Sequence, residues 1–105
     1  MTKIRHLWEI LVPCTKASGV RIRVKFHQRW DAKVQEISGG MTVLQPARGI
    51  WHNVGVVHHD RMIPVRFMAT RDEMEHIVQL TLDHYKDEKA VMAYKVSDEV
   101  ILKFR

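Results

Sequence analysis

Three charged residues stand inside otherwise apolar stretches, where they could do chemistry. Glu9 lies within LWEILV, Arg66 within MIPVRFMA and Lys95 within AVMAYKV. A buried carboxylate needs a partner, and a cation on a neighbouring strand would supply one. One interpretation is a pairing of Glu9 with Arg66 that only satisfies the charges of an interface. The other is a polar anchor for a small anionic or amide ligand in a pocket. We prefer the first.

Histidines gather in the segment 51–61, where they raise the question of a metal site. His58 and His59 are adjacent, so they point to opposite faces of a strand, and only one of them can join His52. A two-residue turn would put His52 on the same face as His59, and a three-residue turn would put it with His58. Either choice gives two imidazoles, fewer than the three or four protein ligands of a zinc site. We therefore expect no metal and no cofactor.

The same segment contains one polar and aromatic grouping, Asp60 and Arg61 near Trp51. It is either a binding site or an exposed ion pair beside a core tryptophan. These residues also enter an enzyme hypothesis, the alternative to a binding module. In that hypothesis Glu9 or Asp60 acts as acid and base, and Arg66 or Arg61 stabilises charge.

The excess positive charge is confined to the first third of the chain. The formal net charge is +5, and residues 1–35 hold eight Lys/Arg against two acidic residues. Basic residues with interleaved aromatics can bind phosphates and stack on bases. The candidates are Arg21, Arg23, Lys25 and Arg29. Phe26 and Trp30, however, fall on the stripe expected to face the core. We therefore prefer a solvated helix flank to a nucleic-acid partner, and weak nucleic-acid binding through these residues is a third functional hypothesis.

Nucleophilic and phosphate-binding motifs are missing from the sequence. Cys14 has Lys16 nearby, which would lower the pKa of its thiol. No serine or cysteine stands in a G-x-S-x-G or cysteine-protease context. Ser38-Gly39-Gly40 is typical of a helix stop and not of a phosphate loop. We expect an ordinary thiol at Cys14.

The elements that must position these residues begin with a strand and a capped helix. Met62–Ala69 alternates with the period of a two-faced strand. Thr70 and Glu73 then have the spacing of a capping box. Apolar residues at helical spacing predict that the helix continues to about Glu88.

The remaining elements follow from similar patterns. Leu7–Val12 is predicted as a buried strand before Pro13, and a helix is predicted from about residue 24 to Ser38, with Gly39 ending it in the left-handed conformation. Further strands are predicted at Met41–Gln45, at Gly49–Trp51 and Val56–Arg61 around a hairpin tip at Asn53–Gly55, and at Ala90–Val96 with a continuation at Val100–Phe104.

The resulting βαββαβ order predicts a single α+β domain over residues 1–105. It is the ferredoxin-like arrangement, an antiparallel sheet with both helices on one face. Pro64 would then lie in a central strand, where proline cannot donate to the ladder. We expect a bulge at Pro64 that resolves this conflict.

The sheet face without helices is predicted to be largely apolar. It would carry Leu7, Leu11, Met62 and Met68 around Glu9, Arg66 and Lys95. A patch of this kind usually marks an interaction site, and a two-fold dimer is the commonest oligomer. We therefore expect a homodimer or higher oligomer that acts as a binding or interaction module, with a small ligand at the interface as a further possibility.

Two runs of sequence carry a resemblance to known proteins. GGMTVLQPARGIW and DRMIPVRF, followed by a helix and a strand, make residues 7–104 similar to small bacterial and phage proteins of uncharacterised function. Trp30, Trp51 and Arg61 contribute to this similarity. The resemblance implies a ferredoxin-like α+β fold and brings no established activity.

Composition predicts the compartment. The one cysteine cannot form an internal disulfide, and a reducing environment is its simplest context. Residues 1–8 lack the apolar core of a signal peptide. No apolar run approaches the ~20 residues of a membrane span. We expect a cytoplasmic protein without a membrane partner.

Overall fold

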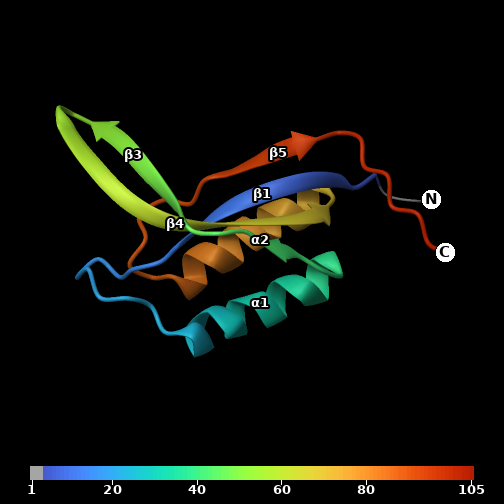
Figure 1. The fold of residues 1–105 in the computed structure, drawn as a ribbon, viewed down its shortest axis with the longest axis horizontal. Helices are drawn as coiled ribbons and strands as arrows, with labels where there is room; N and C mark the ends of the chain where they lie inside the picture. Colours follow the sequence, from blue (N-terminus) through green and yellow to red (C-terminus); the bar gives the residue numbers. More distant parts are fainter. Residues whose placement is uncertain (1–3) are drawn as a thin grey trace.

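The chain forms a sheet laid over two helices (Figure 1). The computed structural model describes residues 4–105; residues 1–3, part of the segment considered above for a signal peptide, lie outside the described residues. The elements in chain order are β1 (His6–Pro13), α1 (Val24–Ser38), β2 (Thr42–Val43), β3 (Ala47–Asn53), β4 (Val56–Ala69), α2 (Arg71–His84) and β5 (Ala93–Ser97).

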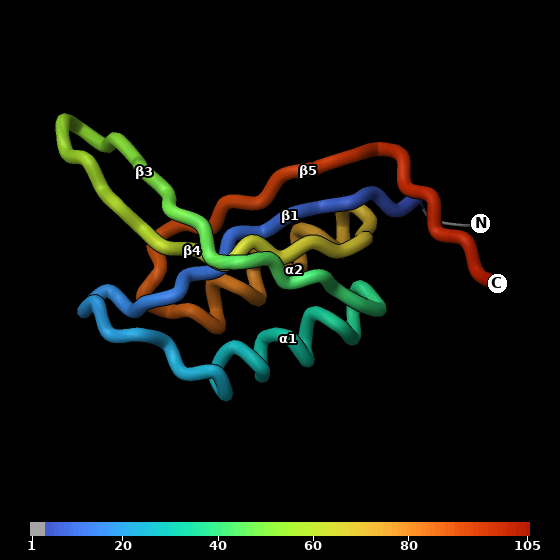
Figure 2. Tube along the Cα trace, viewed as in Figure 1, coloured from blue at the N-terminus to red at the C-terminus, as the bar shows by residue number. Residues whose placement is uncertain are grey.

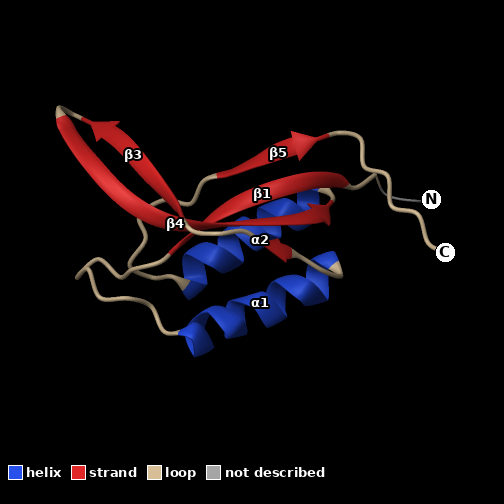
Figure 3. Cartoon of the chain, viewed as in Figure 1, coloured by secondary structure: helices blue, strands red, loops and turns tan. Residues whose placement is uncertain are grey.

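β1 and β4 form the centre of the sheet. They pair antiparallel from His6 opposite Ala69 to Pro13 opposite Met62. β5 lies beyond β1 and β2 lies beyond β4, which gives the order β2-β4-β1-β5, while β3 pairs with the first half of β4. Both helices cover the same face of this five-stranded sheet (Figure 3). The predicted ferredoxin-like α+β fold is confirmed.

Strand alternation assigns the side chains of the central strands to the two faces. The best-buried side chains of the layer between the sheet and the helices are at most 8% exposed. From the sheet they are Trp8, Ile10, Val12, Val65 and Phe67, and from the helices Trp30, Val34, Met74 and Ile77. Full burial of such a side chain contributes about 1.5–3 kcal/mol. This layer is the main source of stability and holds the helices in place.

The ends of the helices are set by local hydrogen bonds and conformation. Thr70 Oγ1 accepts from the Glu73 N–H (3.1 Å), and Glu73 Oε1 accepts from the Thr70 N–H (2.8 Å), so the predicted capping box is confirmed. Gly39 ends α1 with φ 85°, also as predicted. Arg5 joins the two helices, because its guanidinium binds Glu73 and donates to the Ile37 carbonyl (3.1 Å).

The hairpin of β3 and β4 extends away from the helices (Figure 2). Its two strands pair over seven residues, from Ala47 opposite Met62 to Asn53 opposite Val56. We call residues 47–61 the arm. Val54 and Gly55 have φ 47° and 78°, the positive values that a two-residue type I′ turn requires.

Pro64 does not carry the predicted bulge, because the neighbouring edge strand carries the irregularity. Pro64 stays opposite Leu11, and its carbonyl accepts from the Leu44 N–H (2.9 Å), so its backbone faces the edge. Val43 pairs with Val65 and Ala47 with Met62. Residues 44–46 of the edge therefore lie opposite only two residues of β4, 63–64. The missing N–H of Pro64 therefore faces the break between β2 and β3, where a donor is needed least.

The last third of the chain differs from the prediction in three places. α2 ends at His84, short of Glu88, because Tyr85 leaves the helical conformation and turns into the core. β5 spans Ala93–Ser97, and residues 98–105 form no strand.

Neither helix within residues 4–105 has the length and apolar character that a membrane span requires.

A buried hydrogen bond between the helices generates a stability prediction. Thr81 is fully buried; its Oγ1 accepts from Trp30 Nε1 (2.9 Å) and donates to the Ile77 carbonyl (2.6 Å). Thr81→Val preserves the shape but leaves the Trp30 N–H without an acceptor. We expect the free energy of unfolding, measured by urea denaturation, to fall by about 1–3 kcal/mol.

The matched control is a double-mutant cycle with Trp30→Phe. In that background no indole N–H remains to be orphaned, so Thr81→Val should cost well under ~1 kcal/mol. Equal costs in both backgrounds would contradict the assigned role of this hydrogen bond.

Candidate functional site

The sheet face opposite the helices gathers most of the predicted site residues. We call it the open face, and no element of residues 4–105 covers it (Figure 3). Strand alternation and register place on it Leu7, Glu9 and Leu11 of β1, Met62, Arg66 and Met68 of β4, and Tyr94 of β5. The predicted composition of this face, apolar around a charged pair, is therefore present.

A carboxylate lies at the centre of the open face. Glu9 pairs across the strands with Arg66 on one side and Tyr94 on the other. Its Oε1 accepts from Arg66 Nε (2.7 Å), and its Oε2 accepts from the Tyr94 hydroxyl. The Glu9 side chain is only 7% exposed, whereas that of Arg66 is 42% exposed. We call these three residues the Glu9 cluster; it is a charge-assisted network that keeps an ionised carboxylate paired.

Lys95 is not part of this cluster, which corrects its predicted position on the open face. In the ladder between β1 and β5, Lys95 lies opposite Trp8 and Tyr94 lies opposite Glu9. Its ammonium pairs with Asp98 (2.6 Å). Tyr94 takes the place beside Glu9, and sequence reasoning missed it because a shift of one residue exchanges the two.

The predicted grouping of Asp60, Arg61 and Trp51 is divided between two faces. Asp60 lies opposite Gly49, two residues from Trp51, so Asp60 and Trp51 share the face that continues the open face. Arg61 lies opposite Arg48 on the other face. A Cβ at Gly49 would lie 2.8 Å from Trp51 Nε1 and closer still to Met62, so these side chains cover the glycine.

The histidines of the arm have the arrangement predicted for a two-residue turn. The two-residue turn pairs His52 with Val57 and Trp51 with His58, so His52 shares a face with His59 and not with His58. Within residues 4–105, no three His, Cys, Asp or Glu side chains are arranged to hold a metal ion.

The basic stretch surrounds the start of α1. Arg21 and Arg23 precede the helix, Lys25 and Arg29 lie on it, and all four are exposed. Trp30 is 1% exposed and packs inside, so it is unavailable for stacking on bases. A nucleic-acid partner, or its absence, stays a prediction.

Cys14 does not have the lowered pKa that a nearby cation could give a thiol. Burial raises the pKa of the thiol, and the charges of Arg61 and Arg21 oppose this only in part. The thiol is therefore protonated at neutral pH, which agrees with an ordinary cysteine.

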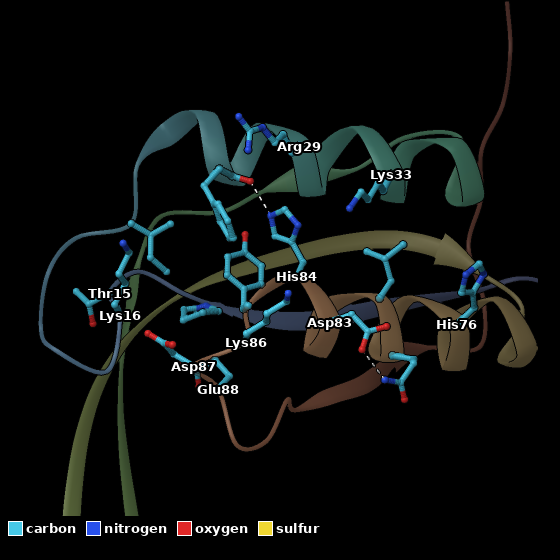
Figure 4. A pocket seen from close by; sticks show the side chains of 16 residues that line it. Thr15, Lys16, Arg29, Lys33, His76, Asp83, His84, Lys86, Asp87 and Glu88 are labelled. Atoms are coloured by element: carbon cyan, nitrogen blue, oxygen red, sulfur yellow. Dashed lines mark hydrogen bonds between the residues drawn. The ribbon is translucent and has the colours of Figure 1, made fainter.

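A second concentration of polar groups lies between the helices and was missed by sequence reasoning. A groove of about 830 Å³ separates α1 from α2 (Figure 4). Tyr85, His84 and Phe26 line it; the Tyr85 hydroxyl and His27 Nδ1 are hydrogen-bonded (2.7 Å), and His84 Nε2 donates to the Phe26 carbonyl (2.7 Å). The available signal was the occurrence of histidine beside an aromatic residue in each helix region, Phe26-His27 and His84-Tyr85.

Burial perturbs the titration of these groups. It lowers the pKa values of both His27 and His84 and raises those of Asp31 and Tyr85. Both imidazoles are therefore neutral at pH 7, and the tautomer of His27 sets whether its Nδ1 accepts from the Tyr85 hydroxyl or donates to it. A pocket with perturbed titratable groups is a candidate binding site on physical grounds.

Comparison with solved structures shows which proteins share this fold. No family model and no curated protein matches the sequence. The periplasmic divalent cation tolerance protein CutA from Archaeoglobus fulgidus is similar with a TM-score of 0.69 and 9% identity, over 94% of this chain and 88% of that one. The divalent cation tolerance protein from Thermus thermophilus gives 0.62 and 11%, over 86% and 82%.

A phage enzyme is also among the similar structures. A phage SAM lyase in complex with S-methyl-5'-thioadenosine gives a TM-score of 0.61 and 8% identity, over 92% of each chain. At these identities the likeness establishes the fold alone. The resemblance to small bacterial and phage proteins thus holds for the fold and extends to no sequence family.

The half-buried histidines of the groove region, His27 and His84, generate a pH prediction. Because folding lowers the pKa values of His27 and His84, the unfolded chain binds protons more readily below pH ~6.5. Stability should be full above this pH and decline as the pH falls below it. We expect the melting temperature to fall between about pH 7.5 and 5.5.

The variant His27→Asn with His84→Gln should flatten that decline. Asparagine can accept from Tyr85, and glutamine can donate to the Phe26 carbonyl, but neither binds a proton in this range. His52→Asn, in the exposed part of the arm, is the control and should leave the decline unchanged. A double variant with the slope of the wild type would show that other groups cause it.

Proposed function

We propose that this chain is a homo-oligomeric binding module whose subunits meet through the open face. The observation that carries the proposal is Glu9, an almost fully buried carboxylate at the centre of a sheet face that no element of residues 4–105 covers. Around it Leu7, Leu11, Met62 and Met68 are half-buried. An apolar surface of this kind usually marks an interaction site.

The Glu9 cluster is prepared for burial at such an interface. A charge that enters an interface unpaired is strongly destabilising, whereas a paired and hydrogen-bonded one is tolerated. Glu9 already has Arg66 on one oxygen and Tyr94 on the other. A second copy could therefore cover this face without leaving the carboxylate uncompensated.

The arm supports the same proposal. Ile50 and Val57 are exposed on one of its faces and Val56 on the other. A two-stranded ribbon with apolar side chains on both faces gains stability when another chain packs against it. We infer that the arm extends the contact surface beyond the sheet.

The test of self-association is a charge placed on the open face. Leu11→Lys should convert the wild-type oligomer to a monomer, because a lysine there would be desolvated without a partner. Light scattering coupled to size-exclusion chromatography measures the mass, and circular dichroism checks that the variant is folded. Gln28→Lys, on the exposed surface of α1, adds the same charge and should remain oligomeric. A monomeric wild-type protein would overturn the proposal.

A second candidate function is a small enzyme or ligand site at the same subunit seam. It is favoured by one observation, that a protein of this fold is a phage SAM lyase with S-methyl-5'-thioadenosine bound. In this proposal Glu9 is the acid and base, Arg66 stabilises charge and Tyr94 orients the carboxylate. The alternative pair of Asp60 and Arg61 is less suitable, because the two side chains point to opposite faces.

Ligand binding by the seam can be measured as a thermal shift with S-methyl-5'-thioadenosine. At a concentration 100 times its Kd, a ligand stabilises the folded state by about 2.7 kcal/mol. The wild-type melting temperature should therefore rise by several degrees. Glu9→Gln should lose the shift, and Glu36→Gln, on the exposed side of α1, should retain it. No shift with the wild type would eliminate this ligand and leave the interface proposal standing.

We also propose a cytoplasmic location. The support is the single cysteine, Cys14, which cannot form an internal disulfide and fits a reducing compartment. Cell fractionation checks this, since one structurally similar protein is described as periplasmic.

A further inference from the structure

We propose that the groove between α1 and α2 is a separate binding site for a small organic anion, one that joins an aryl or alkyl body to a single sulfonate, carboxylate or phosphate group. The groove lies between the two helices (Figure 4), and these helices cover the sheet face opposite the open face (Figure 3). The proposal therefore does not depend on self-association through that face.

The floor of the groove suits an apolar body. Its volume of about 830 Å³ falls in the range of small-molecule pockets. Apolar and aromatic side chains from three parts of the chain line it: Pro13 and Ile22 from the segment around the first loop, Phe26 from α1, and Leu80 and Tyr85 from α2 and its end. Phe26 and Leu80 are only half-buried, so their surface remains available to a ligand.

One wall of the groove suits an anionic group. Arg29 and Lys33 stand one helical turn apart on α1 and both line the groove (Figure 4). Within residues 4–105, neither has a carboxylate oxygen within 4.0 Å. Like charges at this spacing repel each other and destabilise a helix. An anion bound between them would remove that repulsion.

The field of this wall reaches a group at the base of the groove. Burial lowers the pKa of His84, the hydrogen bond to Phe26 opposes this, and the charges of Lys33 and Arg29 lower it further. Asp31 on α1 acts in the opposite direction, and Asp83 on α2 is the acidic group that lines the groove nearby. His84 therefore provides a built-in reporter, because an anion at the wall would raise its pKa.

The opposite end of the groove limits the ligand to a small one. Lys16 and Lys86 there are accompanied by Asp87 and Glu88, so the charges are mixed. Asp87 accepts from the Ala17 N–H (3.4 Å), which keeps one carboxylate at that end. A long polyanion such as nucleic acid would be repelled there, whereas the single anionic group of a compact ligand would contact only the cationic wall.

The test uses two fluorescent probes that differ in one group. 8-Anilinonaphthalene-1-sulfonate carries an aryl body and a sulfonate, and N-phenyl-1-naphthylamine has the same body without the charge. We expect the wild type to bind the sulfonate probe, and Arg29→Gln with Lys33→Gln to weaken it about tenfold. Binding of the uncharged probe should not change between these two proteins.

The matched control removes the same charge elsewhere. Arg23→Gln with Lys25→Gln, two residues beside the groove that do not line it, should weaken the sulfonate probe less than about twofold. Equal weakening by both double variants would show a bulk charge effect and overturn the proposal. Absence of binding by the wild type would overturn it as well. Circular dichroism checks that each variant is folded. Arg29→Lys, with Lys33 unchanged, keeps the positive charge of the wall and should bind the sulfonate probe, which separates the loss of charge from a defect in folding.

The His84 imidazole provides the site-specific readout. Its resonance, assigned by His84→Gln, should titrate at higher pH when the sulfonate probe is bound to the wild type. In the Arg29→Gln with Lys33→Gln protein the probe should cause no such change. Fluorescence without a shift of His84 in the wild type would place the probe on another surface, such as the open face, and overturn the proposal.

Discussion

The pairing of β1 with β4 is the constraint on which the rest of the structure depends. These strands run in one register from His6 opposite Ala69 to Pro13 opposite Met62. That register puts Trp8 beside Phe67 under the helices and Glu9 beside Arg66 on the other side. A slip of one residue would send every side chain of one strand to the wrong face. The core and the Glu9 cluster are therefore specified by the same hydrogen bonds.

The two faces of the sheet have different kinds of polar chemistry. On the open face, polar groups are brought together across strands, and the carboxylate of Glu9 is held by a guanidinium and a phenol. On the helix side, polar groups meet where two helices pack, and neutral imidazoles bond to a hydroxyl and a carbonyl. The open face therefore presents charges that are already paired, whereas the groove combines an apolar floor with cations at its rim.

Local patterns predicted the elements well because their causes are local. The T-x-x-E spacing at Thr70 and the glycine after Ser38 each describe hydrogen bonds or conformations within a few residues, and both are present. The pairing of Glu9 with Arg66 was also predictable, since both stand out as charges in apolar strands. Strand alternation then placed them on one face.

The features that sequence reasoning missed depend on contacts between distant segments. The register that puts Tyr94, and not Lys95, opposite Glu9 is set by how β5 pairs with β1, and no local pattern encodes it. The groove needs the crossing of α1 and α2, so its residues come from opposite halves of the chain. The bulge was predicted at Pro64 from the sequence of its own strand, β4. The irregularity that accommodates Pro64 lies instead in the neighbouring edge, between β2 and β3.

The conformation at the tip of the arm affects local unfolding. Val54 is a β-branched residue at φ 47° and is 96% exposed, so it holds a left-handed conformation without packing in return. Such a conformation costs an L-residue roughly 1–2 kcal/mol. The ribbon behind it has mostly exposed side chains. Its amides should therefore exchange with solvent through local fraying, as a unit apart from the central strands, whose amides exchange only when the whole domain unfolds.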